Sequence, residues 1–258
     1  MRRYFLFTLI LLIGCQSAPE SFTLTLMSYN VRHGVSMHWK PAIKDQAAII
    51  NAQSPDWVGL QEIDHLCRRS NTIDQTSEFG DLTGMRGFFG KFMDFDSGRY
   101  GMAVLSNLPV VKTKILELPE GAEPRVAIIQ TVKLNKKLKL ALANVHFDWT
   151  TSDYRISQAQ TLISYLDKLQ LPTIVLGDYN AKPGSPTLKL FMDSGFQPVK
   201  KKENQLTWPA ENPTVEIDHF FIRGTRKINI SPEFIKVLNE PEASDHLPVV
   251  ARLKILRK

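Results

Sequence analysis

Short apolar runs recur along most of the chain, and the first alternates apolar with polar positions as β-strands do. Phe22, Leu24 and Leu26 alternate with polar or small residues, so residues 22–30 are predicted to form a strand. Other β-rich runs predict further strands over residues 57–63, 86–95, 101–106, 110–117, 125–134, 138–147, 172–176, 215–223, 227–237 and 247–255. The chain is therefore expected to be rich in β-structure.

Apolar residues at helical spacing predict helices between some of these strands. The longest such pattern covers residues 152–169, and shorter ones cover 41–52, 74–84 and 186–194. Strands and helices do not alternate strictly, which argues against a simple doubly wound parallel sheet. This order favours an α/β (α+β) fold in which two mixed or antiparallel sheets pack together with helices outside.

The amino terminus is typical of a targeting segment. Met1-Arg2-Arg3 precedes an apolar run over residues 4–14, which is shorter than the roughly 20 residues that cross a bilayer. The run therefore predicts a signal peptide over residues 1–14. It ends in Leu12-Ile13-Gly14-Cys15, which resembles the bacterial lipobox, in which the cysteine is lipidated and becomes the first residue. The alternative is an ordinary cleaved signal in which a cysteine happens to stand there.

These features divide the chain into a signal peptide (1–14), a lipidated tether (15–21) and one domain (22–258). The expected location is the cell envelope, with the protein lipid-anchored on the periplasmic or extracellular face of a bacterial membrane. Cys67 is then the one remaining cysteine, so neither an intrachain disulfide nor a zinc site built on thiolates is expected.

Composition and charge narrow the picture further. The 258 residues are 43% hydrophobic and 22% charged, which is ordinary for a globular protein and excludes a disordered chain. The formal net charge is +6, and it falls to +4 once Arg2 and Arg3 are removed with the signal peptide. This excess is too small to indicate nucleic-acid binding by itself.

Polar residues with catalytic potential stand at the ends of several predicted strands. A single polar residue at a strand end is commonplace, because it usually caps a turn or meets solvent. Here the pattern occurs six times, at Ser28-Tyr29-Asn30, Gln61-Glu62, Asn144-Val145-His146, Gly177-Asp178-Tyr179-Asn180, Ile217-Asp218 and Ser244-Asp245-His246. If the strands lie side by side, these ends converge on one edge. Carboxylate and amide oxygens suit Mg²⁺ or Mn²⁺, and two imidazoles add acid/base groups.

Taken in order, these six segments resemble the endonuclease/exonuclease/phosphatase superfamily, which includes DNase I-like nucleases, sphingomyelinases and inositol-phosphate phosphatases. The resemblance spans residues 22–255. It implies a four-layer α/β/β/α sandwich and metal-dependent hydrolysis of phosphoesters.

The resemblance also implies roles for individual residues. Glu62 matches the principal Mg²⁺ ligand, with Asn30 beside it and Asp245 near the metal. Asp178 matches the aspartate that orients or activates the attacking water, and Asn180 matches a phosphate-contacting asparagine.

Two histidines complete this set. His246 resembles the catalytic base or phosphate-protonating histidine, which is paired with the aspartate that matches Asp218. His146 matches a second histidine found in the DNase I and sphingomyelinase branches. Whether the site holds one metal or two stays open.

Substrate contacts are less distinctive in the sequence. Arg99, Tyr100 and Arg125 are candidates for binding phosphate, although surface ion pairs explain isolated arginines equally well. The run Lys200-Lys201-Lys202 is interpreted as a solvated loop, and His33 as either a neighbour of the site or a surface residue.

The leading hypothesis is a lipid-anchored, Mg²⁺-dependent (or Mn²⁺-dependent) phosphodiesterase or phosphatase. Its substrate is a lipid headgroup, a small phosphodiester or nucleic acid, and no obligate protein partner is inferred. One alternative is an envelope nuclease acting on DNA or RNA, and a weaker one is a binding lipoprotein without turnover.

Overall fold

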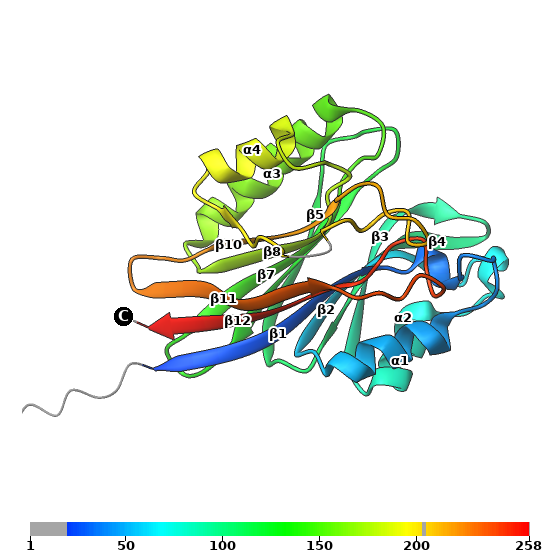
Figure 1. Cartoon of the computed structure of the whole chain (residues 1–258), viewed down its shortest axis with the longest axis horizontal. Coiled ribbons are helices and arrows are strands. Elements are labelled where there is room, and N and C mark those ends of the chain that lie inside the picture. Colours follow the sequence, from blue (N-terminus) through cyan, green and yellow to red (C-terminus); the bar gives the residue numbers. More distant parts are fainter. Residues whose placement is uncertain (1–19, 203–204, 258) are drawn as a thin grey trace, which may run out of the picture.

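The computed structural model describes residues 20–202 and 205–257, so the predicted signal peptide and Cys15 lie outside the described residues (Figure 1). Within this part of the chain, twelve strands form two six-stranded sheets. The first sheet has the order β11-β12-β1-β2-β4-β3, with strands β1 (Ser21–Asn30), β2 (Trp57–His65), β3 (Arg86–Phe95), β4 (Gly98–Ser106), β11 (Ile228–Val237) and β12 (Val249–Arg257). The second has the order β5-β6-β7-β8-β10-β9, with strands β5 (Val110–Glu117), β6 (Val126–Lys133), β7 (Lys139–His146), β8 (Thr173–Asp178), β9 (Gln197–Pro198) and β10 (Asp218–Arg223).

Both sheets are mixed, since β1 pairs parallel with β2 and β7 pairs parallel with β8, whereas the other pairs are antiparallel. Helices α1 (Ile43–Gln53) and α2 (Gln75–Thr83) cover the outer face of the first sheet. Helices α3 (Ser152–Leu169) and α4 (Pro186–Asp193) cover the second (Figure 1). The predicted four-layer α/β/β/α sandwich is thereby confirmed.

The space between the sheets is filled mainly by apolar side chains from alternate strand positions, such as Leu26, Val104 and Leu176. Two buried polar contacts also cross it. The Trp57 indole donates to Gln130 Oε1 at 2.8 Å, and Gln61 Nε2 donates to Asn144 Oδ1 at 2.7 Å. Each contact joins a donor to an acceptor across the interface and so helps to hold the sheets in one relative position, although the other amide oxygen, Gln61 Oε1, has no partner among the described residues.

The predicted elements agree closely with the observed ones. All four predicted helices are present, and the bounds of most strands differ by one to three residues. The short strand β9 was not predicted, since a two-residue pairing has no periodic pattern. None of the helices in the described residues combines the length and apolar character that crossing a membrane requires.

Candidate active site

Strand pairing brings most of the predicted site residues to one edge of the sandwich. His146 lies opposite Asp178 in the parallel pairing of β7 with β8. Asp218 lies opposite Asp178 in the antiparallel pairing of β10 with β8. Asn30 ends β1 in the facing sheet, and its Nδ2 lies 3.3 Å from Asp178 Oδ2. Register alone therefore gathers residues that are far apart in the sequence.

His246 forms a buried pair with Asp218 beside a second carboxylate. Its Nδ1 lies 3.0 Å from Asp218 Oδ2, and its Nε2 lies 3.7 Å from Asp178 Oδ2. Burial by itself lowers the pKa of His246, but the two carboxylates outweigh burial and raise the pKa to about 10. The imidazolium form is thus favoured at neutral pH, so the His246 ring can donate a proton.

The second imidazole, that of His146, has a lowered pKa instead of a raised one. His146 Nε2 lies 3.5 Å from Asp178 Oδ2, while Arg125 Nη1 lies 3.4 Å from His146 Nδ1. Burial, and then the Arg125 guanidinium, lower the pKa of His146 to about 3. One histidine is therefore held charged and the other neutral within one site, a separation that acid/base chemistry uses.

Glu62 reaches the site because β2 contains a bulge. The pairing of β2 with β4 shifts register between Gln61 and Ile63, and Glu62 has a φ of 59°, which is rare for a residue with a side chain. Ile63 then returns to the helix-covered face. Bulges often redirect a side chain toward a functional site, and this one places Glu62 Oε1 3.0 Å from Asn30 Nδ2.

The oxygen atoms around Glu62 fit a divalent cation. Burial opposes ionisation of this carboxyl, but the side chains of His33 and Asn30 hold its pKa well below its usual range. His33 Nδ1 lies 3.9 Å from Glu62 Oε2, and no lysine or arginine pairs with Glu62 among the described residues. Asp178 and Asp245 also line the cavity, and the hard oxygen donors of these carboxylates favour Mg²⁺ or Mn²⁺.

A second possible metal position lies alongside. Asp178, Asp218 and His246 each offer a ligand atom, and these atoms lie within 4.8 Å of one another. Both groups of side chains adjoin Asn30, so the geometry accommodates either one metal or two.

Asn180 is held beside Asp178 by local backbone geometry. Its main-chain N donates to Asp178 Oδ1 at 2.8 Å, and its Nδ2 donates to the Phe147 carbonyl at 3.0 Å. With a φ of 48°, it turns the chain sharply after β8 and lines the cavity.

Gly177 is required where β8 approaches β7. Its φ is +145°, and a Cβ at this position would lie 2.0 Å from the Val145 carbonyl oxygen. We expect Gly177→Ala to destabilise the protein by about 3 kcal/mol in urea unfolding, since strain and overpacking both contribute. Gly84→Ala is the matched control, because Gly84 also has a positive φ (+69°) but meets nothing within 4 Å. It should cost about 1 kcal/mol, and equal losses in the two variants would contradict this account.

These side chains open into a cavity of about 530 Å³. Of the predicted substrate-binding residues, Tyr100 and Arg125 line it, but Arg99 does not and is exposed instead. Alternation along β4 explains the difference, because neighbouring residues of a strand face opposite sides. The lining residues are Glu62, Tyr100, Glu123, Arg125, His146, Trp149, Asp178, Asn180, Lys182, Trp208, Val215, Ile217, Asp245 and His246.

Several of these residues were not predicted. Trp149 and Trp208 line the cavity, and 61% and 40% of their respective surfaces are exposed. Trp57, in contrast, is fully buried in the core. Nothing in the sequence distinguishes these tryptophans. Glu123 was also missed, and its carboxylate lies 2.9 Å from Arg125 Nη2.

The interpretation of Lys200-Lys201-Lys202 as a solvated loop was wrong for its central residue. Lys201 is buried, and its Nζ donates to Glu216 Oε1 at 2.6 Å and to the Asp218 carbonyl at 2.8 Å. Because burial of an ammonium group requires such partners, the contact fixes the main chain at Asp218. His33 proves to be a neighbour of the site, through its contact with Glu62.

A model of the endonuclease/exonuclease/phosphatase family matches residues 27–246, which include all eight predicted catalytic and metal-binding residues. The chain belongs to this family. Among curated proteins it matches the "Carbon catabolite repressor protein 4 homolog 3" of Arabidopsis thaliana, with 21% identity over 163 residues, or 60% of this chain. The match covers 36% of the plant protein, so the chain spans about a third of that relative.

Solved structures of family members share the fold. A family protein from Bacteroides thetaiotaomicron aligns with a TM-score of 0.76 and 18% identity over 92% of this chain and 96% of that one. A mannosyl-6-phosphatase from the same organism aligns with a TM-score of 0.74 and 19% identity, covering 89% and 99% of the two chains. The human Nocturnin catalytic domain, with bound sulfate, gives 0.69 and 21%, covering 92% and 97%.

Proposed function

We propose that this protein is a metal-dependent hydrolase of small phosphoesters, anchored in the cell envelope. One observation carries the proposal: His246, Asp178 and Glu62 line a single cavity, with Asp218 paired to His246 behind it and Asn30 joining Glu62 to Asp178. Membership of the endonuclease/exonuclease/phosphatase family supports the reaction class.

Each of these side chains has a separate role in an in-line displacement at phosphorus. Asp178 orients the attacking water and accepts its proton, helped by burial, which raises the pKa of this carboxyl to about 7. His246 donates a hydrogen bond to a phosphoryl oxygen, and Asp218 holds its ring in place. Arg125 and Asn180 bind the remaining phosphate oxygens from the cavity wall.

Glu62, Asn30 and Asp245 would hold the Mg²⁺ or Mn²⁺. The ion would polarise the phosphoryl oxygen and neutralise charge that develops on the phosphate group. Glu62 supports this assignment, because no lysine or arginine pairs with it among the described residues, whereas Asp245 has Arg32 at 3.6 Å.

The cavity favours a small substrate over a polynucleotide. Its volume is in the range of ordinary small-molecule sites. Apart from its histidines, Arg125 and Lys182 are the cations that line it, and Arg125 is already paired with Glu123, so no basic track leads a nucleic-acid strand to the site. Trp149 and Trp208 offer exposed aromatic faces on which a sugar or base can stack.

A panel of substrates tests this proposal. Purified protein would be assayed with Mg²⁺ against p-nitrophenyl phosphate, bis-p-nitrophenyl phosphate, a hexose 6-phosphate, sphingomyelin and single-stranded DNA. We expect turnover of at least one small phosphoester and much slower cleavage of DNA. Hydrolysis of DNA alone would contradict the assignment and favour an envelope nuclease.

The anchor is tested separately. We expect cells fed labelled palmitate to label the wild-type protein and the Cys67→Ser variant, but not Cys15→Ser, because the lipobox-like junction ends at Cys15. Labelling of Cys15→Ser, or no labelling of the wild type, would contradict the predicted lipidation.

A further inference from the structure

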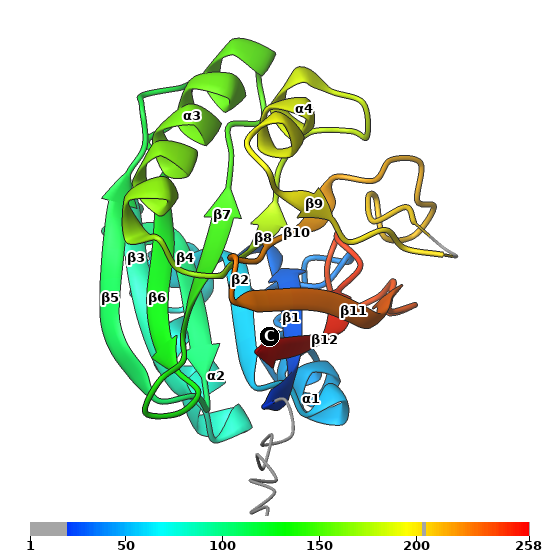
Figure 2. The ribbon, with the colours of Figure 1, turned by 90° about the vertical axis from the view of Figure 1, so that its left-hand side faces the viewer.

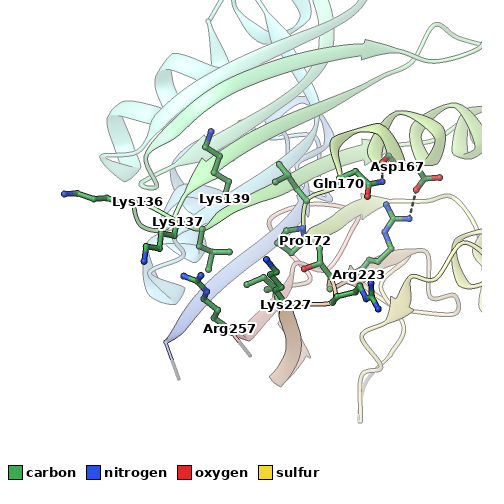
Figure 3. A pocket seen from close by; sticks show the side chains of 15 residues that line it. Lys136, Lys137, Lys139, Asp167, Gln170, Pro172, Arg223, Lys227 and Arg257 are labelled. Atoms are coloured by element: carbon green, nitrogen blue, oxygen red, sulfur yellow. Dashed lines mark hydrogen bonds and ion pairs between the residues drawn. The ribbon is translucent and has the colours of Figure 1, made fainter. Parts of the chain in front are cut away.

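A strongly basic groove lies at the end of the sandwich away from the catalytic cavity (Figure 3). It has a volume of about 760 Å³ and lies between the β6–β7 connection, the β10–β11 connection and the end of β12. Seven cationic side chains and one carboxylate line it, namely Lys136, Lys137, Lys139, Arg223, Arg226, Lys227 and Arg257, with Asp167.

The charge of this groove dominates the molecule. Its local excess of six positive charges exceeds the formal net charge of +4 that remains once Arg2 and Arg3 are removed, so the rest of that chain is slightly acidic. Asp167 is already paired with Arg223, at 2.7 Å. The five exposed cations make no ion pair with any other described residue; they are Lys136, Lys137, Lys139, Arg226 and Lys227. Like charges gathered in this way repel one another, and an external anion would relieve the repulsion.

The groove is separate from the catalytic site. Strand β7 begins at Lys139 in the groove and ends at His146 in the cavity, and β10 runs from Asp218 in the site to Arg223 in the groove. At a rise of about 3.3 Å per residue, the seven steps along β7 span roughly 23 Å. A small ligand in one site therefore cannot touch the other.

The chain enters the fold beside this groove. Glu20 is the first described residue, and its carboxylate lies 3.8 Å from Arg257 Nη1, while its carbonyl accepts from Arg257 N at 2.9 Å. Figure 1 shows the start of β1 and the end of β12 at the same end of the sandwich, and this end faces the viewer in Figure 2. Cys15 precedes Glu20 by five residues, which span at most about 18 Å when fully extended. A lipid on Cys15 would thus hold the groove close to the bilayer surface.

We propose that the basic groove docks on the anionic phosphate headgroups of the membrane that carries the anchor. The inference rests on the lipid anchor of the proposed function, and charge complementarity supplies the attraction. Lysines and arginines near an anionic leaflet each strengthen association with it. Docked in this way, the protein turns its catalytic cavity away from the bilayer, so its substrate comes from the aqueous phase.

A nucleic acid is the competing occupant, since it presents the same phosphate chemistry. Two observations favour the membrane. The groove lies about 23 Å from the residues that would cleave a phosphodiester, and the anchored end of the chain emerges beside Arg257.

Lysine footprinting tests the proposal on the full chain. The protein would be bound to vesicles of phosphatidylcholine alone or mixed with phosphatidylglycerol, acetylated briefly and analysed by mass spectrometry. We expect Lys136, Lys137 and Lys227 to be protected only on the anionic vesicles, with protection lost in high salt. The exposed Lys40 and Lys44, just before and at the start of α1, should react equally on both. Equal labelling of the groove lysines on both vesicles would overturn the proposal. So would stronger protection by a single-stranded oligonucleotide or by inorganic phosphate.

Matched variants distinguish the effect of charge in the groove from the effect of the total charge of the protein. In Lys136→Gln/Lys137→Gln/Lys227→Gln, we expect the preference for anionic over neutral vesicles to fall by about 100-fold, since each lysine contributes roughly fivefold. The control Lys40→Gln/Lys44→Gln/Lys114→Gln removes the same charge outside the groove and should keep the preference. An equal loss in both would contradict docking through the groove.

The readouts also separate this inference from the proposed function. The preference is the ratio of binding to anionic vesicles over binding to neutral vesicles. The lipid anchor contributes to both, so its contribution cancels in the ratio. Groove variants should hydrolyse substrate like the wild type. Absence of hydrolysis would therefore count against the hydrolase alone, and unlabelled Cys15 against the anchor alone.

Discussion

Replacing His246 with alanine is expected to lower turnover by about 10²–10⁴-fold, the range typical of a lost acid/base group. The imidazole lies between Asp218 and Asp178, and these carboxylates hold it protonated where the phosphoryl group would bind. Binding of metal should change little, because Glu62 and Asn30 remain in place. The measurement is steady-state hydrolysis of a chromogenic phosphoester over a range of Mg²⁺ concentrations.

His38→Ala is the matched control for this substitution. His38 is exposed and pairs with Glu242 on the surface, so its loss should leave turnover unchanged. Asp218→Asn keeps the shape of the side chain but removes the charge that fixes the His246 ring. Its turnover should therefore lie between that of the wild type and that of His246→Ala. Wild-type turnover in His246→Ala would show that the imidazole has no part in the reaction.

Replacing Glu62 with glutamine is expected to raise the Mg²⁺ concentration needed for half-maximal activity by about 10–100-fold. Loss of a residue that merely supports a metal ligand typically weakens metal affinity by about 10–100-fold, so loss of a direct ligand should weaken it by at least the upper value. Glutamine retains the size of the side chain and one carbonyl oxygen but removes the negative charge that attracts the ion. Turnover at saturating Mg²⁺ should fall much less than in His246→Ala.

Isothermal titration of Mg²⁺ into the Glu62→Gln variant supplies a readout that does not depend on activity. Glu233→Gln is the control, since Glu233 is exposed on β11, does not line the cavity and makes no ion pair within the described residues. An unchanged Mg²⁺ affinity in Glu62→Gln would remove Glu62 from the metal site.

The sequence predicted the fold and most of the site because both depend on local patterns. Apolar alternation marked the strands, and polar residues at strand ends marked where Asn30, His146, Asp178 and Asp218 would converge. The bulge that turns Glu62 toward Asn30 has no such signature. Glu62 itself is predicted from the family resemblance, but its backbone conformation follows only from the pairing of β2 with β4.

Features that depend on tertiary environment were beyond sequence reasoning. Burial of Lys201 requires Glu216 and the Asp218 carbonyl, which lie 15 to 17 residues away. The basic groove draws on segments around Lys137, Arg226 and Arg257, which only the sheet topology brings together. The sequence shows only a modest net positive charge, whereas the fold gathers seven cationic side chains at one groove.

The most direct test of the account is the metal dependence of hydrolysis by the wild-type protein beside Asp178→Asn. Both proteins would be dialysed against EDTA, and release of product from the best small phosphoester would be followed before and after Mg²⁺ is restored. The account predicts no activity in EDTA, recovery of the wild type with Mg²⁺ or Mn²⁺, and a rate for Asp178→Asn that stays about 10²–10⁴-fold lower. Full wild-type activity in EDTA, or full recovery of Asp178→Asn, would contradict it.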